Sequence, residues 1–211
     1  MKKVLSLVAV VAMMLFVGKA DAQLTFRLGY APQTYTVDYN GSKKSAEMNG
    51  LFVGLSKNIG LSGDLKVSVG VDARFNFKSE TSTIGVTSLD VTRTQLLLDV
   101  PVLFNYGLRL NSDITFSAFV GPTFSYAFFG QNKWEGNASL WGAGISSDGT
   151  EDWYDNTGRG RFDVSVTFGL KLAINEYSLY GGYNMGLVNL TDANNTTLKG
   201  SNIFVGVGLA L

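Results

Sequence analysis

The stretch Leu65-Lys-Val-Ser-Val-Gly-Val-Asp-Ala-Arg-Phe-Asn-Phe77 decides the fold of this chain. Every second residue in it is apolar, and the residues between are Lys, Ser, Gly, Asp, Arg and Asn. Alternation with a period of two is typical of a β-strand that has one apolar and one polar face. The stretch therefore predicts a strand whose second face is polar and mostly small.

The same alternation recurs along the rest of the sequence. It predicts eight strands, at residues 24–31, 51–56, 65–77, 91–106, 114–128, 162–172, 177–188 and 203–211. Leu97 and Leu103 break the rule, because both stand on the polar side of their strand. The links between strands are short at 57–64, 107–112 and 173–176, and long at 32–48, 78–90, 129–160 and 190–200.

The first 22 residues have the pattern of a cleavable export signal. Lys2 and Lys3 precede an apolar stretch at residues 4–17, and Ala20-Asp21-Ala22 places small residues at both positions that a signal peptidase reads. The apolar stretch is shorter than the roughly 20 residues of a membrane-spanning helix. We therefore expect a signal peptide at 1–22 and one β domain at 23–211.

An exported chain of alternating strands fits a membrane β-barrel. An even strand count with alternating short and long links predicts an all-β, eight-stranded antiparallel up-and-down transmembrane barrel, with short periplasmic turns and long extracellular loops. The location this predicts is the bacterial outer membrane, in contact with its lipid. Aromatic residues near the strand ends predict two interfacial girdles, formed by Tyr30, Phe75, Phe77, Tyr126, Phe128 and Phe162 towards the loops and by Phe104, Tyr106 and Tyr177 towards the turns.

The alternative is a soluble periplasmic barrel or sandwich with its apolar face turned inward. A water-facing exterior would be rich in Lys and Glu, whereas the polar positions here are mainly Gly, Ser, Thr and Asn. Small polar residues fit the narrow lumen of an eight-stranded barrel. Charged residues make up only 16% of the chain, against the roughly 25% that is usual in soluble domains. Both observations favour the membrane barrel.

Composition also excludes several classes of function. The chain has neither His nor Cys, so nucleophile pairs such as Ser-His and Cys-His are excluded, and we expect no catalytic site, metal centre or cofactor. Removal of residues 1–22, which include Lys2, Lys3, Lys19 and Asp21, leaves 14 basic and 16 acidic residues. This balance gives no support for nucleic-acid binding.

Three stretches resemble a known family. Leu96-Leu-Leu-Asp-Val-Pro-Val-Leu-Phe-Asn-Tyr106, Phe119-Val-Gly-Pro-Thr-Phe-Ser-Tyr126 and Phe162-Asp-Val-Ser-Val-Thr-Phe-Gly169 are similar to the outer-membrane β-barrel domain common in Bacteroidetes, often called the porin family. More loosely, the chain resembles the small eight-stranded surface barrels of enterobacteria. The resemblance implies an integral barrel inserted by the barrel-assembly machinery. The chain departs from many such proteins by ending on Leu209-Ala210-Leu211 rather than on an aromatic residue.

Inward parity places eight charges in the lumen. Five are basic and three are acidic, namely Arg27, Lys66, Asp72, Arg74, Arg93, Asp99, Asp163 and Lys171. Since buried charges must be paired, we expect a network of salt bridges that fills the barrel and blocks a wide pore. A network that opens transiently to pass small ions is the functional alternative.

The link at 129–160 holds all three Trp residues. Trp134, Trp141, Trp153 and Tyr154 could stack on a surface ligand or protein partner, or they could pack against the barrel mouth. The link could also form a hairpin that extends its flanking strands. Two functions follow: a non-enzymatic surface-interaction barrel with a charge-filled lumen, or a small-solute channel or hydrophobic-ligand carrier. Eight strands favour the first, and a count of ten, if the link hides a hairpin, favours the second.

Overall fold

The computed structural model describes residues 23–84, 87–140, 143–154 and 159–211, so the predicted signal peptide lies outside the described residues. The fold is all-β, and every strand pairing is antiparallel. The strands are β1 (Leu24–Tyr30), β2 (Gln33–Tyr39), β3 (Ser42–Ser62), β4 (Leu65–Ile84), β5 (Thr87–Arg109), β6 (Ile114–Leu140), β7 (Ala143–Asp152), β8 (Phe162–Ile174), β9 (Tyr177–Gly186) and β10 (Thr196–Ala210). In these parts of the chain no helix is both long and apolar enough to cross a membrane.

β1 and β2 together form one position in the barrel wall. Both pair with β3 on one side and β10 on the other, and the register of β2 continues that of β1 without a shift. The interruption falls at Pro32, which has no backbone N–H to donate to the ladder. The ring then runs from β1 and β2 through β3, β4, β5, β6, β8, β9 and β10 back to β1, which confirms the predicted eight-stranded barrel.

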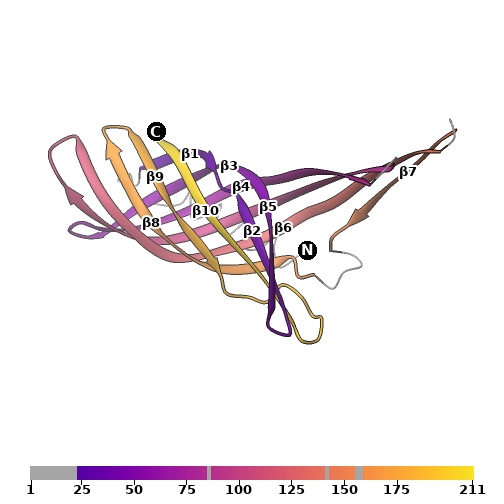
Figure 1. Ribbon diagram of the computed structural model, residues 1–211. Helices are drawn as coiled ribbons and strands as arrows, with labels where there is room; N and C mark the ends of the chain where they lie inside the picture. The colour runs from indigo at the N-terminus through magenta and orange to yellow at the C-terminus, as the bar shows by residue number, and fades with distance from the viewer. Residues whose placement is uncertain (1–22, 85–86, 141–142, 155–158) are drawn as a thin grey trace.

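The long link at 129–160 does contain a hairpin, but the hairpin adds no strand to the wall. Among the described residues β7 pairs with β6 alone, beyond the end of the ring. In Figure 1, β4, β5, β6 and β7 leave the barrel as a long ribbon that ends in the β6–β7 hairpin. We call the part of this ribbon at residues 78–84, 87–94, 131–140 and 143–152 the arm.

The predicted long loops at 32–48 and 78–90 are wrong in one respect, because most of their residues lie in strands. Asn40 and Gly41 form a two-residue turn between β2 and β3, with φ of 50° and 84°. Both central residues of a type I′ hairpin turn need positive φ, and Asn-Gly is its commonest sequence. The link at 190–200 is likewise shortened, because β10 begins at Thr196 and its first residues pair with β2.

The apolar face of the strands is turned outward, as the membrane barrel requires. Leu28, Val53, Val120 and Val207 are each between 43% and 54% exposed on four different strands. The residues predicted to form girdles share this face. Tyr30, Phe75, Phe77, Phe128 and Phe162 are exposed towards the long links, and Phe104, Tyr106 and Tyr177 towards the short turns, while Tyr126 is half-buried against Phe128.

The two exceptions to the alternation point into the barrel. Leu97 and Leu103 are each 6% exposed and share the inward face of β5 with Asp99. A β-bulge lies opposite this region, since Leu96 pairs with Phe129 and Leu97 with Ala127. Phe128 is the extra residue, and it shifts the parity of β6 before the arm begins.

Candidate functional site

The lumen is the candidate site, and small polar side chains line most of it. Within an eight-stranded ring the inward side chains nearly fill the interior. Buried hydroxyl and amide residues on the inward face are Thr25, Gln33, Ser56, Ser68, Asn76, Gln95, Ser117, Thr123, Ser125, Ser165, Thr167, Ser178 and Asn202. Thr123 of β6 and Thr167 of β8 are diagonal neighbours across the strand pairing, and their hydroxyls share a hydrogen bond of 2.5 Å.

Two ion pairs lie inside the lumen. Arg27 of β1 donates from Nε and Nη2 to the carboxylate of Asp72 on β4. Arg74 of β4 donates from Nε to Asp99 Oδ2 at 2.8 Å and from Nη2 to Asp99 Oδ1 at 3.2 Å. Asp72 and Asp99 are direct cross-strand neighbours, so two carboxylates stand side by side and each is held by its own arginine. Two-pronged pairing of this kind offsets the cost of burying the charges.

Amides extend the Arg74 pair to the far wall. Gln33 Oε1 accepts hydrogen bonds from Arg74 Nη1 and, at 3.3 Å, from Asn202 Nδ2. Asn202 Oδ1 in turn accepts from Asn184 Nδ2 at 2.9 Å. The chain of contacts therefore runs from Asp99 on β5 to Asn184 on β9. It ties together strands on opposite sides of the ring.

A second polar cluster lies above the first, towards the long links. Gln95 is 1% exposed, and its Oε1 accepts from Tyr35 Oη at 2.8 Å and from Asn76 Nδ2 at 3.0 Å. Its Nε2 donates to the hydroxyl of Tyr154 at 2.5 Å. Burial raises the pKa of Tyr154 to about 12, so the phenol stays protonated at neutral pH.

Aromatic and apolar side chains close this end of the lumen. Tyr35, Met48, Trp153 and Leu190 are all buried in one cluster, which we call the cap. The guanidinium of Arg159 lies 4.1 Å from the ring centre of Tyr35 and 4.8 Å from that of Trp153. Cation–π contacts of this kind hold a charge against apolar surface. The cap therefore packs at the end of the lumen that faces the long links.

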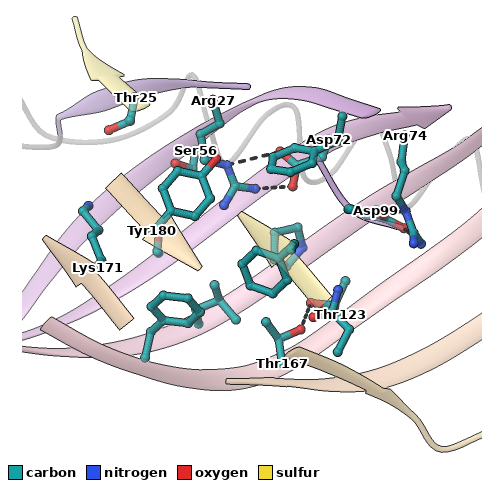
Figure 2. Close-up of a pocket in the computed structure, with 18 of the residues that line it drawn as sticks. Thr25, Arg27, Ser56, Asp72, Arg74, Asp99, Thr123, Thr167, Lys171 and Tyr180 are labelled. Carbon is teal, nitrogen blue, oxygen red and sulfur yellow. Dashed lines mark hydrogen bonds and ion pairs between the residues drawn. The ribbon is translucent and has the colours of Figure 1, made fainter. Parts of the chain in front are cut away.

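A layer of aromatic rings crosses the lumen below the cap. Phe52, Phe119 and Tyr180 are buried on the inward face, and Phe204 packs against them. The ring centre of Phe204 lies 6.2 Å from that of Phe119 and 6.4 Å from that of Tyr180. Next to this layer is a cavity of about 70 Å³, lined also by the two ion pairs, Lys171 and several hydroxyls (Figure 2).

The structure brings some of the predicted lumen charges together and separates others. Arg27, Asp72, Arg74 and Asp99 meet in the ion pairs, and Lys171 lines the cavity. Asp163 points inward, with its Oδ2 3.4 Å from the position that a Cβ on Gly200 would occupy. Lys66 is exposed near a short turn. Arg93 lies on the arm, where it pairs with Glu80 at 3.3 Å, and takes no part in the lumen pairs.

The aromatic residues of the link at 129–160 lie in different parts of the structure. Trp153 is 6% exposed in the cap, and Tyr154 contacts Gln95. Trp134 is half-buried on the arm, where its ring covers Gly149 of β7. Trp141 lies outside the described residues.

Several lumen residues were missed by the sequence analysis. Tyr35 and Gln33 were assigned to a loop, although the Asn40-Gly41 turn could have shown that a strand precedes it. Arg159 carried no signal in the sequence, because its role depends on rings from β2 and the 153–154 segment. Across the described residues there is no group of three or more acidic side chains placed to hold a metal ion.

The chain resembles several proteins of known structure. Among solved structures it is similar to Ail, the attachment invasion locus protein of Yersinia pestis, with 14% identity, 90% of this chain and 99% of that chain covered, and a TM-score of 0.42. It is also similar to Neisserial surface protein A, with 12% identity, coverage of 87% and 96%, and a TM-score of 0.36. The N-terminal β-barrel domain of Pseudomonas aeruginosa OprF gives 10% identity, coverage of 87% and 97%, and a TM-score of 0.30.

No curated protein sequence matches the chain. A family model described as the outer membrane protein beta-barrel domain matches residues 18–192, which is most of the chain. This match agrees with the closed eight-stranded ring and its outward apolar face. The chain belongs to the outer membrane protein β-barrel domain family and is an outer-membrane protein.

Proposed function

We propose that this protein is a non-enzymatic surface barrel of the Bacteroidetes type, in which the lumen is a structural plug and the arm makes contacts outside the membrane. Residues 1–22 would direct export and be removed before Gln23, and the barrel-assembly machinery would insert the mature chain. The absence of His and Cys from the sequence supports a role without nucleophilic catalysis. The membrane-facing surface contacts outer-membrane lipid.

The observation that carries the proposal is closure of the lumen at successive levels. The Arg74–Asp99 pair bridges β4 and β5 within the ring, and the cap covers the end that faces the long links. We expect charged pairs and aromatic rings in series to leave small ions no continuous aqueous path. A barrel closed in this way offers its outer surfaces, rather than its interior, for function.

Planar-bilayer recordings with purified protein test the plug. We expect no stable conductance from the wild type. Asp99→Ala removes the partner of Arg74, and we expect at most brief openings from it. Stable wild-type conductance that disappears in Asp99→Ala would contradict a purely structural plug.

The arm supports the surface-contact part of the proposal. On one face of the arm, Val91 of β5 pairs with Trp134 of β6, and Leu89, which pairs with Gly136, is 40% exposed. A flat indole on an exposed sheet is a common contact for a ligand ring or a protein partner. Trp134, which lies over Gly149, is the residue that we expect to contribute most.

Adhesion of cells that express the protein to immobilised glycans and serum proteins tests the arm. Deletion of residues 138–152 removes the hairpin and leaves the ring intact, and Trp134→Ala removes only the indole. We expect both variants to reduce adhesion, while Trp153→Phe, a conservative change in the cap, leaves it unchanged. If adhesion survives the deletion at the wild-type level, the arm does not provide the contact surface.

The cavity beside the aromatic layer favours a second candidate, a small-solute channel or hydrophobic-ligand carrier. Its volume of about 70 Å³ is far below the several hundred Å³ of typical ligand pockets. Swelling of liposomes that contain the protein, in solutions of small sugars, separates the candidates. Solute entry above the rate of empty liposomes would favour the channel.

A further inference from the structure

We propose that the turn-side part of the cavity beside the aromatic layer binds one small oxyanion, of the phosphate or carboxylate class, between Lys171 and the hydroxyl of Tyr180. This site goes beyond the surface role proposed above, because it faces the periplasmic end of the lumen. The residues that carry it lie on β8 and β9, away from the arm and the cap.

The charges that line the cavity do not balance. Arg27, Arg74 and Lys171 are positive, whereas Asp72 and Asp99 are the negative side chains of the lining. Each carboxylate is already engaged by an arginine through two hydrogen bonds. One positive charge is therefore left over, and it is the ammonium group of Lys171.

Lys171 makes no ion pair within the described residues. Lys66 and Arg27 act on it as like charges, and the carboxylates of the cavity lining, Asp72 and Asp99, are held by arginines. A cation in a narrow interior without a carboxylate of its own attracts a mobile anion, since the low dielectric strengthens each interaction. The electrostatics therefore favour a counter-ion from solution beside Lys171.

Tyr180 provides a second donor at the same place. It is the direct cross-strand partner of Lys171, and its side chain is 7% exposed. Its hydroxyl is buried and has no hydrogen-bond partner among the described residues. Figure 2 shows Lys171 and Tyr180 on neighbouring strands, with Arg27 and Asp72 beyond the Tyr180 ring. A buried hydroxyl without a partner costs free energy until an acceptor reaches it.

An oxyanion satisfies both donors and supplies the opposite charge, whereas water supplies no charge. A water molecule could accept hydrogen bonds from Tyr180 and Lys171 but would leave the excess charge of Lys171. Oxygen atoms of a carboxylate or phosphate accept from both donors and neutralise the charge. The cavity of about 70 Å³ has room for a few water molecules or one small anion. Access is from the turn side, because the aromatic layer and the cap cover the other end.

Isothermal titration calorimetry on the full barrel in a non-ionic detergent tests the site. Inorganic phosphate and acetate are titrated separately at neutral pH, with sodium chloride at equal ionic strength as the reference. We expect saturable binding of at least one of the two oxyanions, and the stronger of the two identifies the class. Lys171→Met should weaken that binding by about tenfold or more, because a charged hydrogen bond is lost.

Two further variants keep the result interpretable. Tyr180→Phe retains the ring of the aromatic layer and removes only the hydroxyl, so it should weaken binding even if Lys171→Met does not fold. Lys133→Met is the matched control, because Lys133 pairs with Glu135 on the arm at 2.5 Å and is remote from the cavity. The proposal is overturned if neither oxyanion binds more than chloride, or if the lumen variants bind as the wild type and Lys133→Met do.

Discussion

Phe119 of β6 lies directly across from Gly169 of β8, and its ring occupies the space where a side chain on Gly169 would begin. A Cβ on Gly169 would be 2.5 Å from Phe119 Cζ. The same relationship recurs between Phe52 and Gly29 and between Phe204 and Gly182. Rings that fold over glycines of the next strand fit inside a narrow barrel, and they form the aromatic layer.

Gly169→Ala should therefore destabilise the barrel. The added methyl would lie 2.2 Å from the carbonyl oxygen of Gly181 as well as against Phe119, so backbone must shift. Overpacking of this kind costs about 1–3 kcal/mol. Urea unfolding in detergent, followed by tryptophan fluorescence, measures the loss. Gly60→Ala is the control, since nothing lies within 4 Å of its Cβ position, and it should unfold as the wild type does.

Loss of one partner of the Arg74 pair should cost more than loss of an arm pair. Asp99→Ala leaves the buried guanidinium without its carboxylate, at a cost of roughly 3–5 kcal/mol. Glu135→Ala removes the carboxylate that pairs with the exposed Lys133 and should leave the unfolding midpoint unchanged. Equal effects of the two substitutions would mean that the lumen pair is well hydrated.

A double substitution tests whether the Arg74–Asp99 pair itself stabilises the barrel or whether each charge only neutralises the other. Arg74→Met combined with Asp99→Leu removes both charges and should recover most of the loss seen in Asp99→Ala. Some loss should remain, because Gln33 also accepts a hydrogen bond from Arg74. The unfolding midpoints of the three proteins decide this, and a double variant no better than the single one would point to a cost other than the unpaired charge.

A charged residue should destabilise the protein on the outward face of the barrel but be tolerated on the arm. Val53 is 43% exposed midway along β3, and Val53→Arg should cost about 2–4 kcal/mol when the protein folds into lipid vesicles. Thr83→Arg places the same charge on an exposed arm position of β4 and should have little effect. Comparable folding of the two variants would mean that Val53 does not face hydrocarbon.

The burial of Tyr154 next to the cap should be measurable in the alkaline titration of its hydroxyl. Burial raises its pKa to about 12, above the ordinary value of 10.0. The unfolded chain loses this proton first, so the contribution of Tyr154 to folding stability is full below pH 10 and falls as the pH rises towards 12. The tyrosinate absorbance of the wild type minus that of Tyr154→Phe should have its midpoint near the raised value. A midpoint near 10.0 would indicate that the hydroxyl is open to water.

The sequence was sufficient for the strands and their faces because these depend on neighbours in the chain. Alternation placed Asp72, Arg74 and Asp99 inside and Val53 outside, as the structure has them. Even the exceptions were visible, since Leu97 and Leu103 stood at inward positions and are buried there. Parity needs no knowledge of partners, because successive side chains of a strand point to opposite faces.

Local signals also explain one error. The turn at Asn40 and Gly41 is encoded by two adjacent residues, and giving it weight would have converted the predicted loop at 32–48 into a hairpin. The β6–β7 hairpin has no equally strong turn sequence in its described residues. Its pairing with β6 outside the ring depends on how far each strand runs beyond the membrane, which alternation does not report.

What the sequence alone determined is a ring of strands with an apolar outside and a small polar inside. Only the tertiary structure decided which charges meet, that Arg93 pairs on the arm while Arg74 pairs in the lumen, and which glycines face Phe119 and Phe52. These contacts join residues tens of positions apart, and a shift in register by a single residue would exchange every partner. Register across a closed barrel is set by all its strands together, so no single stretch of sequence contains it.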